Sequence, residues 1–197
     1  IWLLQRALKG RGIEAIQGNV ILDTAYFQLP QLDPGAFDGE PLAIYNALPA
    51  ALLANYNAST FTFKVVDDTV AITPELKQPE LAVTSRLVLD DTPCGEWKDR
   101  VLTTVSGPMR NELSFEGRYA RDCGEKHWSL NLYDATRNFD VTFRALWAES
   151  GGVLTGNTRL GAAPADTPPL LSFPSIPLAD ALRNLNKYSN NLMTRNL

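Results

Sequence analysis

The sequence predicts an α+β fold, because segments with helical periodicity flank a long segment with strand periodicity in a chain of 197 residues. The first dozen residues and the stretch after residue 130 have apolar side chains at helical spacing. Between them, residues 61–128 alternate apolar and polar side chains in short runs separated by turn residues. This pattern is typical of a small β-sandwich or barrel-like domain.

The opening segment predicts a helix followed by two short strands. Apolar residues fall on one helical face, and two glycines end the run: Ile1, Leu4 and Leu8, then Gly10 and Gly12. Two short apolar runs follow, split by Gly18-Asn19, and they predict strands at residues 13–16 and 20–22. Residues 29–41 concentrate Pro, Gly and Asp, so we expect an irregular loop there.

Helical periodicity returns after the β-rich middle. Apolar residues at spacings of three and four predict a helix that ends at the Ser-Gly-Gly of residues 150–152; they are Leu132, Ala135, Phe139, Phe143 and Leu146. Residues 153–160 predict one more strand, and residues 161–169 have the composition of a linker.

The last segment predicts a helix capped by Ser175, with Pro177 tolerated in its first turn. Its apolar stripe consists of Leu178, Leu182, Leu185 and Leu192. Ser189 falls on the same stripe. A hydroxyl on an apolar face either bonds back to a carbonyl one turn earlier, which is the commoner outcome, or is directed at a site.

Composition and charge exclude two classes of protein. Lys and Arg number 18 against 22 Asp and Glu, and this net charge of −4 is too acidic for a nucleic-acid-binding surface. No apolar stretch reaches the roughly 18 residues that a transmembrane helix needs. The chain also begins without Met or a secretory signal pattern, so we expect an internal piece of a longer protein.

The two cysteines, Cys94 and Cys123, each precede a glycine in a predicted turn. Without a third Cys or a nearby His they cannot form a tetrahedral zinc site, so we expect no metal and no cofactor. A structural disulfide is the favoured interpretation, and it implies an oxidising compartment such as a periplasm. The alternative is a pair of free buried thiols in a cytosolic protein. The single histidine, His127, is interpreted as a structural or surface residue.

One serine motif carries the chemistry. Ser189-Asn190-Asn191 has the S-x-N form, although the tripeptide is weak evidence alone because Ser129-Leu130-Asn131 repeats it. Penicillin-binding proteins and β-lactamases combine such a motif with S-x-x-K and K-T-G. Neither of these two partners is present in the sequence. The nucleophile and the third motif are therefore missing from it.

The chain nevertheless resembles the class C low-molecular-mass penicillin-binding proteins, which are D-alanyl-D-alanine carboxypeptidases/endopeptidases of peptidoglycan. The resemblance covers nearly the whole chain and is most specific in Asn186-Lys-Tyr-Ser-Asn-Asn-Leu192. It extends to the two Cys-Gly turns and to three further segments: residues 11–23, 45–53 and 151–156.

The resemblance implies nested domains. Residues 1–60 plus 129–165 would form an α/β accessory domain, and residues 61–128 an all-β domain inserted in it. Residues 166–197 would then be a helical return into the transpeptidase-like catalytic domain. It implies that Ser189 relays a proton to the leaving D-alanine amine, and that Asn191 hydrogen-bonds the substrate backbone.

The resemblance also implies an acidic residue that holds the free amine of the stem peptide's diaminopimelate. Asp38 or Glu40, in the loop of residues 29–41, is the nearest match. The competing interpretation of this pair is an ordinary acidic turn, and we rank it first because the loop cannot be aligned well.

Two hypotheses of function follow. In the first, the chain is part of a periplasmic serine enzyme that acts on peptidoglycan peptides and is acylated by β-lactams, and the fragment alone is inactive. In the second, it is a non-catalytic envelope module that binds peptidoglycan or a partner protein. An S-x-x-K and a K-T-G elsewhere in the parent protein would favour the enzyme.

Overall fold

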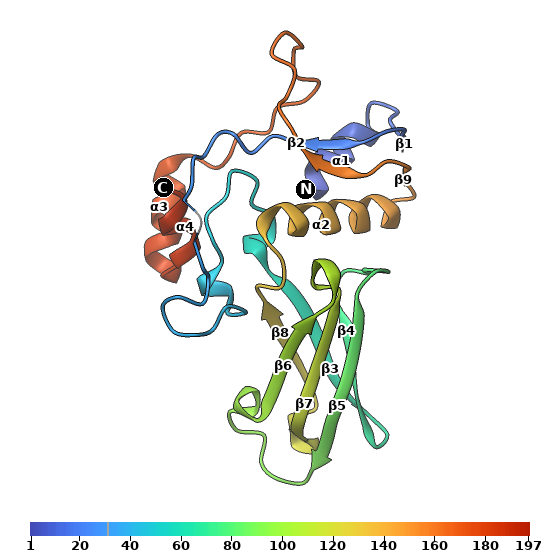
Figure 1. The fold of residues 1–197 in the computed structure, drawn as a ribbon, viewed down its shortest axis with the longest axis vertical. Helices are drawn as coiled ribbons and strands as arrows, with labels where there is room; N and C mark the ends of the chain where they lie inside the picture. Colours follow the sequence, from blue (N-terminus) through green and yellow to red (C-terminus); the bar gives the residue numbers. More distant parts are fainter. Residues whose placement is uncertain (31) are drawn as a thin grey trace. The chain divides into compact units, whose positions relative to one another are not determined.

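The computed structural model describes residues 1–30 and 32–197; Gln31, in the loop predicted for residues 29–41, lies outside them. The chain has mixed helix and strand content with small sheets, and it divides into two compact units (Figure 1). Unit 1 comprises Ile1–Ala58 and Tyr133–Leu197, and unit 2 is Ser59–Leu132. The assignment of residues 166–197 to a separate catalytic domain stays a prediction.

Two helices pack together in unit 1. The first, α1 (Trp2–Lys9), ends at Gly10, and the second, α2 (Ala135–Glu149), begins after Asp134. The Asp134 carboxylate accepts a hydrogen bond of 2.9 Å from the Arg137 N–H, which is the interaction that an N-cap residue provides. The helix ends before the predicted Ser-Gly-Gly.

Unit 1 also contains two small parallel ribbons. One pairs β1 (Ala15–Ile16) with β9 (Val153–Leu154), and the other pairs β2 (Val20–Leu22) with β10 (Thr158–Leu160). The single strand predicted over residues 153–160 is therefore wrong. Gly156 lies between β9 and β10, and the backbone there passes so close to Gly18 that a Cβ on Gly156 would lie 1.8 Å from the Gly18 carbonyl oxygen.

A buried ionic network ties α2 to the second ribbon. Asp140 accepts hydrogen bonds from Arg144 Nε at 2.6 Å and from the Thr158 hydroxyl, and Arg137 lies 3.1 Å from its other oxygen. Arg144 also donates to the Gly156 carbonyl at 2.9 Å. Since the carboxylate is largely buried and paired on both oxygens, its charge is compensated.

The carboxyl-terminal part of unit 1 differs from the prediction. The helix α3 (Leu178–Tyr188) is preceded by Pro177 at the N-cap, not by Ser175. The expected continuous helix to residue 192 is also wrong, because Ser189 adopts the left-handed conformation and a second helix, α4 (Asn191–Asn196), follows. Two 3-10 turns, η1 (Ile44–Asn46) and η2 (Asn55–Asn57), lie in the amino-terminal half of the unit.

Unit 2 consists of two three-stranded sheets. One sheet has the order β4-β3-β8, with β3 (Ser59–Val66) antiparallel to β4 (Thr69–Pro74) and to β8 (Glu125–Leu130). The other has the order β5-β7-β6, where β7 (Glu112–Ala120) runs parallel to β5 (Ala82–Asp90) and antiparallel to β6 (Val101–Ser106). Three 3-10 turns connect the strands: η3 (Trp97–Arg100), η4 (Pro108–Arg110) and η5 (Arg121–Cys123).

An aromatic cluster forms the core of unit 2. Phe61, Phe63, Phe115 and Tyr119 are fully buried, and the rings of Phe63 and Phe115 meet edge to face with centroids 4.9 Å apart. The predicted disulfide between Cys94 and Cys123 is present. It joins the segment before η3 to η5, within the same unit.

Candidate functional site

The Ser189-Asn190-Asn191 motif forms the turn between α3 and α4. Ser189 has φ 48° and ψ 46°, a conformation that is strained for a residue with a Cβ. Its N–H closes α3 by donating to the Leu185 carbonyl. The residue is exposed, and its hydroxyl makes no hydrogen bond to another described residue. The back-bonded alternative is therefore not realised.

The other two residues of the motif play different parts in the turn. Asn190 is half-buried, and its side-chain oxygen accepts a hydrogen bond of 2.9 Å from the Met193 N–H, so it is the N-cap of α4. Asn191 is the first residue of α4, and it is exposed. The motif therefore presents its first and third residues to solvent and uses its second to begin a helix.

The helix α4 is anchored in unit 1 at its far end. Asn196 accepts a hydrogen bond of 3.1 Å from the Ala50 N–H and donates one of 2.8 Å to the Leu192 carbonyl. Leu192 is 2% exposed. The helix contacts both α3 and the turn η1; α3 and α4 lie together at the carboxyl terminus in Figure 1.

Asp38 accepts three hydrogen bonds although it is exposed. The Glu40 N–H donates at 2.9 Å, the Asn46 amide at 2.8 Å and the Tyr45 hydroxyl at 3.0 Å. These donors, the Glu40 N–H first, lower the pKa of the Asp38 carboxyl from its usual value of 3.8. The hydrogen bond to Asp38 in turn raises the pKa of the Tyr45 hydroxyl. The site offers a fixed carboxylate that stays ionised.

The structure separates the two acidic candidates. The Glu40 side chain is exposed and makes no hydrogen bond or ion pair to the described residues, whereas its backbone donates to Asp38 and accepts from Asn46. Glu40 therefore contributes backbone geometry to the loop. Asp38 has a side chain that is held by three donors and a carboxyl whose pKa is lowered.

The turn η1 contacts elements of both candidate regions. Tyr45 and Asn46, which bond Asp38, belong to η1, and η1 contacts α4. The Ser-Asn-Asn turn and the Asp38 loop thus lie on elements that pack on each other in unit 1.

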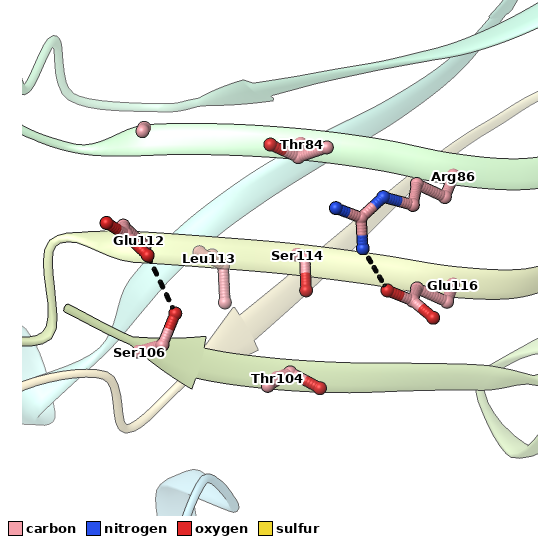
Figure 2. Close-up of a pocket in the computed structure, with 9 residues that line it drawn as sticks. Thr84, Arg86, Thr104, Ser106, Glu112, Leu113, Ser114 and Glu116 are labelled. Carbon is pink, nitrogen blue, oxygen red and sulfur yellow. Dashed lines mark hydrogen bonds and ion pairs between the residues drawn. The ribbon is translucent and has the colours of Figure 1, made fainter.

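Unit 2 has a shallow depression on the outer face of the β5-β7-β6 sheet (Figure 2). Its charged side chains bond to neighbours: Arg86 pairs with Glu116, and the Ser106 hydroxyl donates to Glu112 at 2.9 Å. None of the site residues predicted from the sequence lines it. His127 lies exposed on β8 in the same unit, with Nδ1 3.1 Å from the Thr62 hydroxyl.

Residues 1–30 and 32–197 contain neither a metal-ligand cluster nor a membrane-spanning helix. No three His, Cys, Asp or Glu side chains in this part of the chain gather as metal ligands would. Each helix in the same ranges is too short or too polar to cross a lipid bilayer.

The model of the D-Ala-D-Ala carboxypeptidase 3 (S13) family matches residues 1–197. The chain belongs to this family. Membership agrees with the resemblance to class C penicillin-binding proteins that the sequence carries, and it makes the chain a D-Ala-D-Ala carboxypeptidase-related protein. No curated protein matches the chain.

Two solved structures of penicillin binding protein 4 (dacB) from Haemophilus influenzae have a similar fold. The first is 22% identical to this chain with a TM-score of 0.72, and the match covers 98% of this chain and 42% of the solved chain. The second, which is complexed with a novel β-lactam, is 19% identical with a TM-score of 0.61, and the match covers 98% of this chain and 40% of the solved chain. The chain thus spans about two fifths of the length of these two proteins.

Sequence reasoning missed four residues that organise this site. Tyr45 and Asn46 hold Asp38, while Asn190 and Asn196 fix the two ends of α4. The role of Asn190 could have been predicted from the sequence, because Asn directly before an apolar helical run is a preferred N-cap. The contacts of Asn46 and Asn196 depend on the tertiary fold and leave no local signal.

Proposed function

We propose that the chain forms part of a serine D-Ala-D-Ala carboxypeptidase/endopeptidase that acts on peptidoglycan stem peptides through an acyl-enzyme. The observation that carries the proposal is the exposed left-handed turn at Ser189, in a chain of the S13 family. Backbone strain at an exposed polar residue is characteristic of catalytic and ligand-binding positions.

In this proposal Ser189 transfers a proton towards the amine of the departing D-alanine. Its hydroxyl is suited to that role because it is exposed and not bonded to the described residues. Asn191 hydrogen-bonds the backbone of the stem peptide with its carboxamide, which both donates and accepts. The serine that attacks the peptide and the lysine that activates it belong to an S-x-x-K motif outside this sequence.

Asp38 binds the free amine of the stem peptide's diamino acid. Support comes from its three hydrogen-bond donors, which keep the carboxylate ionised and oriented. A charge-assisted hydrogen bond from an ammonium group is stronger than one between neutral groups. Glu40 serves this subsite through its backbone, while its side chain remains in solvent.

The whole protein would be periplasmic and would bind β-lactams. The disulfide Cys94–Cys123 supports an oxidising compartment. One of the two similar structures is a complex with a β-lactam, which supports acylation of the parent protein by this class of compound.

Reaction with a fluorescent penicillin tests the proposal. We expect the full-length protein to form a covalent adduct, and the 197-residue chain to form none because it lacks the nucleophile. In the full-length protein, Ser189→Ala should slow release of D-alanine from a stem pentapeptide by two orders of magnitude or more. Ser175→Ala, at an exposed serine outside the motif, is the matched control and should leave this rate unchanged.

Two outcomes would contradict the proposal. An adduct on the 197-residue chain would show that the nucleophile lies within it. A full-length protein that binds peptidoglycan but neither reacts with penicillin nor releases D-alanine would instead support the non-catalytic envelope module.

A further inference from the structure

We infer that Asn190, the middle residue of the motif, is a positioning residue whose carboxamide fixes the turn that presents Ser189 and Asn191. The inference rests on the roles proposed above for those two flanking residues. It assigns to Asn190 itself no contact with the substrate.

The side chain of Asn190 is used within the protein. Its Oδ1 accepts from the Met193 N–H at 2.9 Å, and its backbone carbonyl accepts from the Thr194 N–H at 3.1 Å and from the Thr194 hydroxyl at 3.0 Å. These bonds complete the first turn of α4. A helix leaves its first four N–H groups without internal partners, and the Asn190 side chain supplies one.

The small size of α4 makes this cap important. The helix has six residues, and isolated helices of that length are not stable in water. Its position therefore depends on its ends and on Leu192, which is buried. Asn196 holds the carboxyl-terminal end through the Ala50 N–H, and Asn190 holds the amino-terminal end, next to Ser189.

The turn itself needs support from both sides. A left-handed conformation at a residue other than glycine persists only where its surroundings fix it. On the α3 side, the Ser189 N–H bonds the Leu185 carbonyl. On the α4 side, the Asn190 cap is the side-chain hydrogen bond nearest to the strained residue. Loss of the Asn190 cap lets the turn relax, and both Ser189 and Asn191 then shift from their positions.

The test measures the second-order rate of acylation of the full-length protein by a fluorescent penicillin. We expect Asn190→Ala to slow acylation about fivefold, which corresponds to a lost N-cap of ~1 kcal/mol. Asn190→Ser and Asn190→Asp, which replace the amide by other good N-caps, should stay within about twofold of the wild type. Asn184→Ala, an exposed asparagine of α3, is the matched control and should react like the wild type.

A second measurement separates positioning from general stability and from the proposed catalytic role. In the 197-residue chain, amide hydrogen exchange at Met193 should speed up in Asn190→Ala and return to the wild-type rate in Asn190→Ser. Exchange in α2 should be the same in all three proteins. This readout needs no enzymatic activity, so it remains decisive if the full-length protein fails to react with penicillin.

The inference is overturned if Asn190→Ala acylates as fast as the wild type, or if Asn190→Ser is as slow as Asn190→Ala. It is also overturned if exchange at Met193 is unchanged by Asn190→Ala. If Asn190→Ala does not fold in the full-length protein, the comparison of Asn190→Gly with Asn190→Gln decides. Glycine is an adequate N-cap and should retain the rate, whereas the longer glutamine should reduce it.

Discussion

The carboxamide of Asn46 donates a hydrogen bond of 2.8 Å to Asp38, eight residues earlier in the chain. Asn46 is 2% exposed, whereas the carboxylate that it holds is on the surface. A buried donor thus orients an exposed acceptor, and the adjacent Tyr45 hydroxyl holds the other oxygen. The Asp38 side chain therefore ties its loop to the turn η1.

The ionisation of Asp38 should respond to the loss of Tyr45. Its pKa is lowered by the Glu40 N–H, the Tyr45 hydroxyl and the Asn46 amide, so Tyr45→Phe should raise it. NMR titration of the Asp38 carboxyl carbon in the 197-residue chain measures the change. We expect a wild-type midpoint below 3.8, and a higher midpoint in the variant.

The lowered pKa of Asp38 also makes the stability of the fold depend on pH. Because the pKa of Asp38 is lowered by folding, its contribution to stability is present above pH 3.8 and is lost as the pH falls through the folded value.

The matched control for the titration of Tyr45→Phe is Tyr26→Phe, since Tyr26 is exposed and has no bond to Asp38. An unchanged midpoint in Tyr45→Phe would remove the tyrosine from the subsite.

Alkaline pH should destabilise unit 2 through Tyr119. Burial, with a smaller effect of Glu125, raises the pKa of this hydroxyl from 10.0 to about 12. The neutral phenol therefore favours the folded state, and its contribution to stability is full below pH 10 and lost as the pH rises towards 12. Urea unfolding between pH 9 and 12 should show a decline that is weaker in Tyr119→Phe. Equal declines in both proteins would contradict this assignment.

A methyl group at Gly156 should destabilise unit 1. A Cβ there would lie 1.8 Å from the Gly18 carbonyl oxygen, so the ribbon β2–β10 would have to move away from its neighbour. We expect Gly156→Ala to lower the free energy of unfolding by roughly 2–4 kcal/mol. Gly10→Ala is the control, because Gly10 has φ −60° and an added Cβ would make ordinary contacts. Thermal unfolding of both variants checks the difference.

Removing the disulfide should weaken unit 2 selectively. The bond closes a loop with a sequence separation of 29, for which chain entropy predicts about 3–4 kcal/mol of stabilisation. In the double variant Cys94→Ser/Cys123→Ser, amide hydrogen exchange in β7 should speed up while exchange in α2 stays the same. Equal acceleration in both elements would mean that the two units unfold together.

Local patterns in the sequence predicted the elements better than their breaks. The alternation of Phe61 and Phe63 along β3 identified a strand with one buried face, and both side chains are fully buried in unit 2. The spacing from Leu185 to Leu192 is equally compatible with one helix or two, so the break at Ser189 could not be read from periodicity. A dihedral angle at a single residue leaves no trace in an apolar pattern.

Tertiary contacts account for what the sequence could not show. In α1 the buried side chain is Gln5, a polar residue, because its amide donates to the Phe143 carbonyl of α2 at 2.6 Å. Apolar periodicity alone cannot anticipate such a residue. The same holds for the loop of Asp38 and Glu40: the sequence offered both acidic residues without a preference, and the hydrogen bonds that Tyr45 and Asn46 donate to Asp38 depend on the tertiary fold.

The chain enters and leaves unit 2 at neighbouring points. Ser59 and Leu130 are partners across β3 and β8, and on the unit 1 side the Asn57 amide donates to the Tyr133 carbonyl at 2.7 Å. A gene rearrangement that inserted or deleted residues 59–132 would therefore only need to join ends that already meet. A relative with a short turn in place of residues 59–132 would keep the rest of unit 1 intact. The same junction would allow an engineer to replace residues 59–132 with another domain.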